Sequence, residues 1–297
     1  MKIGYIGLGK MGANMTRFLL ERGHRVVAYD ISKERVLELT GEGADGAFSL
    51  EEFVSKLEAP RVIWIMVQRD AVESVLGDLK PLLGRGDTII EGGNTFYKDT
   101  IRRARDIEER GIGYLDVGVS GGVRGARHGA CMMIGGRRDL FEKNEELFRD
   151  LTVPDGYGYL GNSGAGHFVK MVHNGIEYGM MGAIGEGMQA IYKYQKEFGA
   201  DLAEAIKVYG HGSIISSRLM DWLSDAWKEE PYLLSVKGEV PYGETEEEME
   251  ALEKLAEMPV LESARLARVQ TRKSPSFAGA VMSALRNQFG GHAVKKK

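Results

Sequence analysis

The run Lys2-Ile-Gly-Tyr-Ile-Gly-Leu-Gly-Lys-Met-Gly12 decides the fold of the N-terminal half. It begins as a short apolar strand, passes through glycines spaced Gly-x-Gly-x-x-Gly, and continues into a helical pattern. Strand, glycine turn and helix in this order are the context in which a dinucleotide binds. Gly7 permits a tight turn, Gly9 lets a pyrophosphate approach the backbone, and Gly12 allows close packing of helix on strand. We therefore expect the turn to contact the cofactor through Gly7, Leu8, Gly9, Lys10, Met11 and Gly12.

A second apolar strand, residues 25–30, ends in an aspartate at about the distance from the glycines where a carboxylate binds both ribose hydroxyls. A carboxylate at this place repels a 2′-phosphate, so Asp30 favours NAD over NADP, and the nearby Lys33 moderates that preference. The alternative is an ordinary strand-to-helix turn with a surface aspartate. It is disfavoured because strand, glycines and acid occur together.

Short apolar strands alternate with amphipathic helices up to about residue 160, and the later strands are expected at 61–67, 87–91, 114–117, 130–134 and 157–160. This alternation predicts an α/β Rossmann domain with a doubly wound sheet over residues 1–163. Beyond it the pattern is helical, which predicts an all-α C-terminal domain over residues 164–297 with a long spine helix from about 167 to 197. Close helix packing on this spine is indicated by Gly175, Gly179, Gly182, Gly185 and Gly187.

Composition narrows the class of protein. The chain has 297 residues, 43% hydrophobic content and a formal net charge of −4, and it shows no basic stripe interleaved with aromatic residues. We expect a soluble globular protein that does not bind nucleic acid, because such a basic stripe is absent. We also expect no membrane span, because no apolar run reaches the ~18 residues that a span requires. The chain starts directly in a strand, which leaves no room for a signal peptide, and its single Cys131 permits neither an internal disulfide nor a cysteine-built metal site. A cytoplasmic location follows as an expectation.

The run Lys170-Met-Val-His-Asn-Gly-Ile-Glu-Tyr178 is the most informative part of the helical half. At 100° per residue, Lys170, His173, Asn174, Glu177 and Tyr178 share one helix face. The other faces carry apolar residues that suit solvent poorly, namely Phe168, Val169, Met171, Val172 and Ile176. Burial of five polar groups would cost free energy, so a wet pocket with a polar ligand is favoured over a solvated helix face.

Several segments resemble one enzyme family in order and spacing. They are Gly7–Gly12 with Asn14-Met15, Gly92-Gly-Asn-Thr95, Val119-Ser-Gly-Gly-Val123 with Gly125-Ala126, Gly166 to Tyr178, and Arg286-Asn-Gln-Phe-Gly-Gly-His292. Together they resemble 6-phosphogluconate dehydrogenase of the decarboxylating type, in its short form, over nearly the whole chain. The glycine turn and the Ser-Gly-Gly run are shared with all β-hydroxyacid dehydrogenases, so the Lys170–Tyr178 run is the specific part.

The residue types suit that family's chemistry. Lys170, if it is desolvated enough to be neutral, can take the proton of a hydroxyl β to a carboxylate while hydride leaves for nicotinamide. The β-keto acid then loses carbon dioxide, and Glu177 can protonate the remaining enediol on carbon. His173 and Asn174 would donate hydrogen bonds to the substrate between them.

The resemblance adds contacts in the N-terminal half. It implies that Asn94 lies near both nicotinamide and substrate, and we place Val67 with the cofactor as well. Ser120, Gly121 and Gly122 would offer a hydroxyl and backbone N–H groups to the substrate carboxylate. Taken alone, Asn94 is equally well a turn residue and the Ser-Gly-Gly run a plain loop.

The far end of the substrate is where the sequence departs from the family. The resemblance implies Tyr178, Arg268, Arg286 and His292 as ligands there, the last two from the partner subunit, with Arg265 and Arg272 as alternatives to Arg268. The family carries a basic residue, a tryptophan and a threonine where this chain reads Glu246-Glu-Glu248. Carboxylates there oppose a dianionic phosphate. Either the loop is rearranged and Lys237 substitutes, or the substrate is not 6-phosphogluconate.

Three hypotheses follow. The favoured one is an NAD-dependent oxidative decarboxylase of 6-phosphogluconate or a related aldonate, active as a homodimer or a multiple of one. The second is a non-decarboxylating β-hydroxyacid dehydrogenase for a small unphosphorylated acid, and the third is a catalytically retired cofactor sensor, which Lys170 and Glu177 argue against. Of the remaining segments, the acidic stretch 244–257 is expected to be a solvated helix and residues 295–297 a frayed tail.

Overall fold

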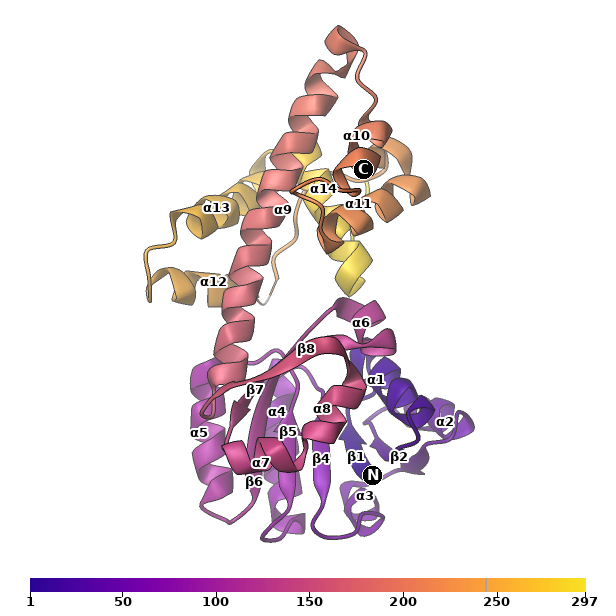
Figure 1. Ribbon diagram of the computed structural model, residues 1–297, viewed down its shortest axis with the longest axis vertical. Coiled ribbons are helices and arrows are strands. Elements are labelled where there is room, and N and C mark those ends of the chain that lie inside the picture. Colours follow the sequence, from indigo (N-terminus) through magenta and orange to yellow (C-terminus); the bar gives the residue numbers. More distant parts are fainter. Residues whose placement is uncertain (244) are drawn as a thin grey trace. The chain divides into compact units, whose positions relative to one another are not determined.

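The computed structural model describes residues 1–243 and 245–297 and resolves into two compact units, Met1–Lys170 and Met171–Lys297. Unit 1 is the α/β half and unit 2 the helical half (Figure 1). The division falls inside the longest helix, α9 (Ala165–Phe198), a few residues beyond the domain boundary expected at 163.

Unit 1 is built on a single eight-stranded sheet in the order β3-β2-β1-β4-β5-β6-β7-β8. The strands are β1 (Lys2–Ile6), β2 (Arg25–Tyr29), β3 (Asp45–Ala47), β4 (Val62–Ile65), β5 (Thr88–Glu91), β6 (Gly113–Ser120), β7 (Ala130–Gly136) and β8 (Thr152–Gly161). Every neighbouring pair is parallel except β6 and β7. The strand order reverses beside β1, and ligands of open α/β sheets bind at the carboxyl ends of the strands at such a switch point.

Helices cover both faces of this sheet. They are α1 (Lys10–Glu21), α2 (Lys33–Gly41), α3 (Leu50–Ser55), α4 (Val72–Leu79), α5 (Tyr97–Glu108), α6 (Gly122–His128), α7 (Arg138–Lys143) and α8 (Glu145–Leu151), with 3₁₀ turns η1 (Arg69–Ala71) and η2 (Lys80–Leu82). Strand side chains alternate between the faces, so Trp64 packs with α1 and α8 while its neighbours Ile63 and Ile65 pack with α3, α4 and α5. The doubly wound sheet expected from the sequence is confirmed.

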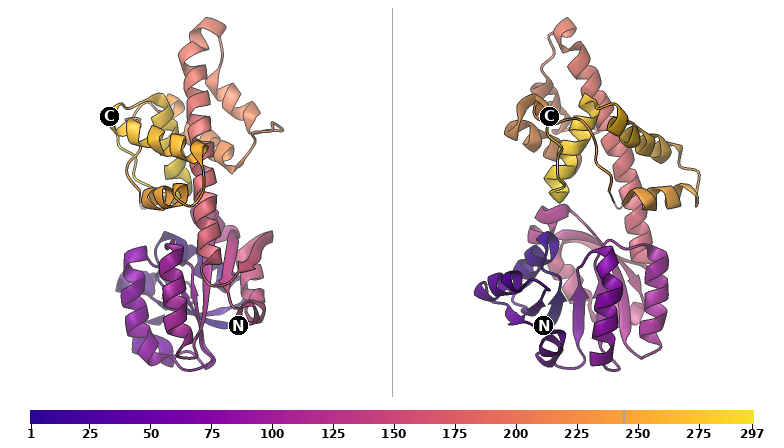
Figure 2. Two further views of the ribbon diagram at one scale, coloured as in Figure 1. Left: turned by 90° about the vertical axis from the view of Figure 1, so that its left-hand side faces the viewer. Right: turned by 180° about the vertical axis from the view of Figure 1, so that it is seen from behind.

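Unit 2 is helical, as expected, and α9 is its spine (Figures 1 and 2). The other elements are α10 (Leu202–Tyr209), α11 (Arg218–Glu229), α12 (Thr245–Glu253), α13 (Pro259–Lys273), α14 (Phe277–Gly290) and the 3₁₀ turn η3 (Pro231–Leu233). The core gathers apolar side chains from several helices, among them Met181, Met220, Leu223, Val281 and Leu285.

Glycines on α9 allow its neighbours to approach. A Cβ on Gly175 would meet Leu252 at 3.1 Å, and one on Gly185 would meet the carbonyl oxygen of Ala278 at 3.0 Å. Gly179 and Gly182 also face close neighbours, whereas Gly187 has open space around it. Close packing is therefore found at four of the five expected glycines.

Three expectations about exposure are wrong. Ile176 is 58% exposed although its helix face was expected to avoid solvent. The acidic stretch is not a fully solvated helix, because Glu246 and Glu248 of α12 are only 6% and 3% exposed. The C-terminal tail is paired rather than frayed: Val236 and Lys296 form an antiparallel bridge, and Lys295 contacts Glu239.

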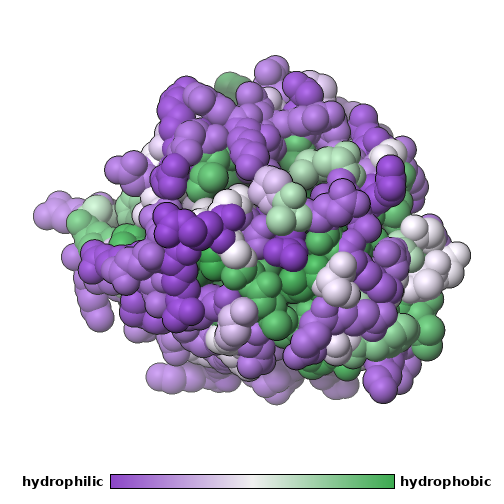
Figure 3. Space-filling view, turned by 90° about the horizontal axis from the view of Figure 1, so that it is seen from below, coloured by the Kyte–Doolittle hydropathy of each residue, from purple (hydrophilic) through white to green (hydrophobic). Residues whose placement is uncertain are grey.

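The surface seen from below is mostly hydrophilic, with hydrophobic side chains gathered near the middle of that face (Figure 3). Within the described residues, no helix combines the length and the apolar character needed to cross a bilayer.

Candidate functional site

The glycine turn between β1 and α1 has the geometry that its spacing predicts. Gly7 has a φ of +94°, and a Cβ there would overlap the carbonyl oxygen of Met66. A Cβ on Gly12 would overlap the carbonyl oxygen of Gly7, so helix and strand pack too closely for any side chain. By contrast, nothing lies within 4 Å of a Cβ on Gly9, which caps the N-terminus of α1. The turn thus leaves open space where a pyrophosphate would meet the helix N-terminus.

Asp30 follows β2 and is tied to this turn. Its carboxylate accepts hydrogen bonds from the backbone N–H groups of Leu8 at 2.6 Å and Ser32 at 2.8 Å. Arg35 lies 3.6 Å from the same carboxylate. A carboxylate has about four acceptor positions, so Asp30 keeps acceptor capacity for a ribose hydroxyl.

The other expected cofactor residues surround the turn. Lys10 is exposed at the start of α1, and Met11 packs against the core beside it. Val67 lies just after the end of β4, and one of its methyl groups is 2.8 Å from the position that a Cβ on Gly7 would take. The structure therefore brings Lys10, Met11 and Val67 to the carboxyl edge of the sheet with the glycines.

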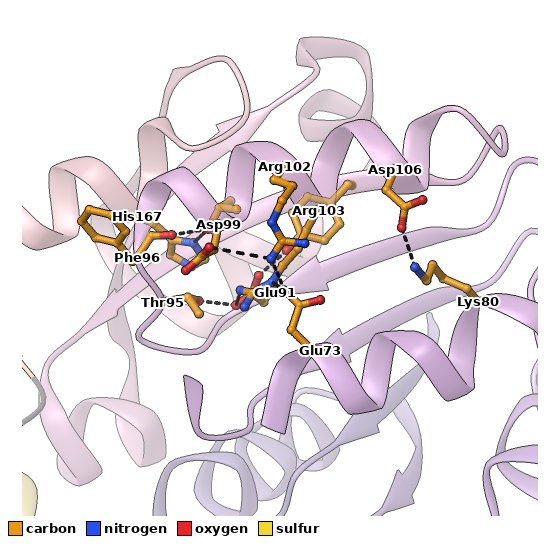
Figure 4. Close-up of polar contacts among 12 residues, drawn as sticks. Glu73, Lys80, Glu91, Thr95, Phe96, Asp99, Arg102, Arg103, Asp106 and His167 are labelled. Atoms are coloured by element: carbon orange, nitrogen blue, oxygen red, sulfur yellow. Dashed lines mark hydrogen bonds and ion pairs between the residues drawn. The ribbon is translucent and has the colours of Figure 1, made fainter. Parts of the chain in front are cut away.

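A buried ionic network holds the loop that carries Asn94 (Figure 4). Glu91, the last residue of β5, is fully buried and accepts hydrogen bonds from the Thr95 and Tyr114 hydroxyls. Arg103 lies 3.5 Å from the same carboxylate and donates to Glu73 at 2.9 Å.

The Glu91 network fixes the shape of residues 92–95. Burial raises the pKa of Tyr114, and the Glu91 carboxylate beside it acts in the same direction, so the phenol stays protonated and donates. The Thr95 hydroxyl donates a hydrogen bond to the Glu91 carboxylate, so one contact links the two ends of the loop that presents Asn94.

The Ser120-Gly-Gly run lies where β6 ends and α6 begins. Gly121 and Gly122 both have positive φ values, +113° and +61°, which side chains rarely adopt. Ser120 is half-buried at the last position of β6. Successive glycines of this kind can turn backbone N–H groups toward an anion.

Lys170 is positioned by β6 within unit 1. The fully buried Asp116 of β6 accepts hydrogen bonds from the backbone N–H groups of Gly164 at 2.7 Å and His167 at 2.9 Å, which caps the first turn of α9. One turn later, a Cβ on Gly118 would overlap the Cβ of Lys170. Strand β6 and helix α9 therefore pack tightly against each other at Lys170, the residue expected to act as the base.

The rest of the stripe continues along α9 in unit 2. Asn174 and Tyr178 are buried, whereas the His173 and Glu177 side chains are 36% and 25% exposed. His173 Nδ1 lies 3.3 Å from Asn174 Oδ1 and 4.0 Å from a Glu177 carboxylate oxygen. An imidazole, a carboxamide and a carboxyl group thus lie within reach of one another on one helix face.

At the end of the stripe, unit 2 gathers a cluster around Tyr178. The Arg268 guanidinium lies over the Tyr178 ring, 3.3 Å from its centroid, and the Tyr178 hydroxyl is 2.8 Å from the Thr245 hydroxyl. Arg286 donates to the Pro241 carbonyl oxygen at 2.8 Å and lies in electrostatic range of Tyr178 and Glu177. Arg286 of the same chain therefore lies near this cluster, and its delivery from a partner subunit stays a prediction.

The other basic residues considered as substrate ligands are either paired with carboxylates or exposed. Arg265 is paired with Glu250 and Glu253, and Lys237 with Glu239. Arg272 is paired with Glu246 of the acidic segment. His292 is exposed beyond α14 and stacks edge-on against Phe289. Glu244, which opens the acidic segment, lies outside the described residues.

The sequence reasoning missed three residues. Glu91 and Asp116 were quoted only as parts of strands, although an acid in an otherwise apolar strand signals a buried carboxylate that needs partners. Thr245 was passed over among the glutamates around it, and only the fold shows that its hydroxyl meets Tyr178.

Comparison with known proteins agrees with this architecture. The NAD binding domain of 6-phosphogluconate dehydrogenase matches residues 2–159, and the C-terminal domain of the same enzyme matches residues 166–197. The chain belongs to the 6-phosphogluconate dehydrogenase family. As a family member it is an oxidoreductase with a Rossmann domain for a nicotinamide dinucleotide.

Two relatives match this family member over its whole length. YqeC of Bacillus subtilis (strain 168), which is only provisionally named a 6-phosphogluconate dehydrogenase, is 47% identical over 299 residues and covers 100% of both chains. The NAD(+)-dependent, decarboxylating 6-phosphogluconate dehydrogenase of Haloferax volcanii is 37% identical over 302 residues, which cover 100% of this chain and 99% of that one.

A solved structure shows the same arrangement of elements. It is the 6-phosphogluconate dehydrogenase of Plasmodium falciparum, studied with NADP+ and with 6-phosphogluconate. The TM-score is 0.80 at 27% identity, and the match covers 92% of this chain and 62% of that one.

Proposed function

We propose that this family member catalyses the NAD-dependent oxidative decarboxylation of 6-phosphogluconate or a closely related aldonate. The products would be ribulose 5-phosphate or the corresponding ketose, carbon dioxide and NADH. One observation carries the proposal: α9 presents an amine, an imidazole, a carboxamide and a carboxyl group on a single face, from Lys170 to Glu177. A full-length relative from Haloferax volcanii is named for this reaction.

The glycine turn suits a nicotinamide dinucleotide. Gly7, Leu8, Gly9, Lys10, Met11 and Gly12 would hold the pyrophosphate, and Asp30 the adenine ribose, with Val67 and Asn94 nearer the nicotinamide. NAD bound there would accept the hydride that the substrate loses. Asp30 supports NAD over NADP, because its buried carboxylate would repel a 2′-phosphate.

The first chemical step is proton removal by Lys170. Its neutral amine takes the proton of the hydroxyl β to the substrate carboxylate, the carbinol hydrogen leaves as hydride, and a ketone forms. The bond from the α-carbon to the carboxylate then breaks and releases carbon dioxide, while the ketone oxygen takes the proton back from Lys170, which leaves an enediol. Glu177 gives its proton to the α-carbon while Lys170 removes the proton of the enediol hydroxyl, and the ketose results.

Other residues would position the substrate for these steps. Asn94, Ser120, Gly121 and Gly122 would bind its carboxylate end, and His173 and Asn174 its hydroxyl groups. Tyr178, Arg268, Arg286 and His292 would bind its far end. Such positioning groups matter because a displacement of about 1 Å at a reacting centre can lower the rate ~10²-fold.

We also propose that the active form is a homodimer or a multiple of one. Exposed apolar side chains on the helical unit, such as Val260 and Leu266 of α13, support this proposal because an obligate dimer buries such groups. Light scattering tests it, and a fully active monomer would refute it.

The proposed reaction is tested by its stoichiometry. Purified enzyme is given NAD and each of several aldonates, and NADH absorbance and released carbon dioxide are measured in the same vessel. One carbon dioxide per NADH is expected. NADH without carbon dioxide would favour the non-decarboxylating β-hydroxyacid dehydrogenase instead, and no NADH from any aldonate would refute the proposed reaction.

A further inference from the structure

The first turn of α9 carries a buried histidine that the proposed mechanism does not use. His167 is 2% exposed, and its Nδ1 lies 2.8 Å from the hydroxyl of Thr100, which is fully buried on α5. Its Nε2 is buried without a hydrogen-bond partner among the described residues. A buried polar atom without a partner costs folding free energy. An apolar side chain would therefore fill this place more favourably, which indicates a role for the imidazole beyond packing.

The contact between His167 and Thr100 joins α9 to α5, whichever of the two atoms donates (Figure 4). The Thr100 hydroxyl is also 3.4 Å from the carbonyl oxygen of Phe96, the residue that caps the N-terminus of α5. Phe96 directly follows the loop 92–95 that presents Asn94. The imidazole is therefore connected, through one hydroxyl group, to the backbone that follows Asn94.

The two helices also pack closely around this contact. The rings of Tyr97 on α5 and Phe168 on α9 meet edge to face, with their centroids 5.3 Å apart. A Cβ on Gly164, just before α9, would lie 2.7 Å from the Ile101 side chain of α5. Because α5 and the first turn of α9 are in such tight contact, a displacement of one helix moves the other.

The backbone of His167 is bound to the sheet. Its N–H donates a 2.9 Å hydrogen bond to Asp116 of β6. Lys170 follows three residues later, about one helical turn along α9, where its Cβ packs against Gly118 of β6. His167 thus contacts β6 through its backbone and α5 through its side chain, one turn before the proposed base. All of these residues belong to unit 1.

We propose that His167 is a positioning residue that holds Lys170 and the Asn94 loop in one fixed arrangement, so that the base and the nicotinamide ring reach the same substrate carbinol group. The inference rests on the proposed function, because the roles of Lys170 and Asn94 are themselves proposed there. A displacement of about 1 Å at a reacting centre lowers the rate ~10²-fold. Loss of the link should therefore appear in kcat rather than in the binding of substrate or NAD.

Two substitutions at His167 distinguish the two imidazole nitrogens. Asparagine places an amide atom where Nδ1 lies and keeps the bond to Thr100, whereas glutamine places its amide near the position of Nε2. His167→Asn should retain kcat within about threefold of the wild type, because the link is kept. His167→Gln should lower kcat about tenfold or more and change KM and the Kd for NAD by less than about twofold.

The measurements use NAD with 6-phosphogluconate and with gluconate. The value of kcat is expressed per NAD-binding site found by titration, so that unfolded chains are not counted. Equal losses of kcat in the two variants, a loss carried by KM, or wild-type kcat in His167→Gln would overturn the inference while leaving the proposed reaction intact. No NADH from the wild type with either acid would refute the proposed reaction and, with it, this inference.

The other side of the contact gives a second test. Thr100→Val keeps the shape of the side chain but removes the hydroxyl, so it should lower kcat about as much as His167→Gln, whereas Thr100→Ser should retain kcat. Since both losses break one link, the double variant of Thr100→Val and His167→Gln should be no slower than either single variant.

The matched control for Thr100 is Thr152→Val, which removes another buried hydroxyl of unit 1. Thr152 lies at the start of β8, where its hydroxyl donates to the Phe148 carbonyl oxygen, and its loss should leave kcat unchanged. Losses that add in the double variant, or the same kcat in Thr100→Val and Thr152→Val, would contradict the link between His167 and Thr100.

Discussion

The carboxylate of Asp116 accepts a 2.9 Å hydrogen bond from the backbone N–H of His167, so strand β6 caps the helix that carries Lys170. The second carboxylate oxygen binds Gly164 N–H at 2.7 Å. Two of the unsatisfied donors at the α9 terminus are thereby paired with a fully buried acid. Asp116 is therefore a positioning residue for the proposed base.

Replacement of Asp116 tests this role. Asp116→Ala should lower the free energy of unfolding by about 2 kcal/mol, because a helix cap is lost and two buried N–H groups are left unpaired. It should also lower kcat while leaving NAD affinity nearly unchanged. Hydrogen exchange should become faster at the amides of residues 164–168. The control is Asp106→Ala at the exposed pair with Lys80, and unchanged exchange at the start of α9 would contradict the capping role.

Glu91 should act on catalysis through Asn94. Glu91→Gln breaks a buried charge pair with Arg103 and should lower the free energy of unfolding by about 3 kcal/mol and lower kcat/KM. If the loop carries the effect, the same substitution in an Asn94→Ala background should change kcat/KM little.

The matched control for Glu91 is Glu73→Gln, which removes the exposed partner of the same Arg103. Its effect on stability should be within about 1 kcal/mol, as is usual for exposed pairs. Full additivity of Glu91→Gln and Asn94→Ala in kcat/KM would show that Glu91 does not work through the loop.

The fold was predictable where periodicity and glycine spacing are local signals. The β1–α1 turn and the α9 spine follow from residues adjacent in sequence. The short strand β3 was missed because Asp45-Gly-Ala has too few apolar residues to register. The burial of Glu246 was missed because only the packing of α12 in the fold shows which glutamates leave solvent.

Cofactor choice depends on Asp30. NAD should give a higher kcat/KM than NADP, and Asp30→Ala should narrow the gap, because the repulsion of a 2′-phosphate is lost. Arg35, 3.6 Å from Asp30, is then released and could attract the phosphate. A wild-type enzyme that prefers NADP under matched conditions would show this assignment to be wrong.

We expect Arg268 to contribute to substrate binding while lowering the stability of the folded protein. Arg268→Met replaces a buried cation by an apolar side chain and should raise the free energy of unfolding by about 1 kcal/mol. The same variant should raise KM for the anionic substrate strongly and change KM for NAD little. Chemical denaturation and initial rates measure the two effects, and a variant less stable than wild type with unchanged KM would contradict a binding role.

The most direct test of the proposed mechanism is the rate of NADH formation by Lys170→Met with saturating NAD and substrate. Loss of the general base should reduce this rate by ~10²–10⁴. The glycine turn joins β1 and α1, whereas Lys170 lies on α9. The affinity for NAD, measured by fluorescence, should therefore stay close to that of the wild type. NADH formation at the wild-type rate by this variant would contradict the assignment of Lys170 as the base.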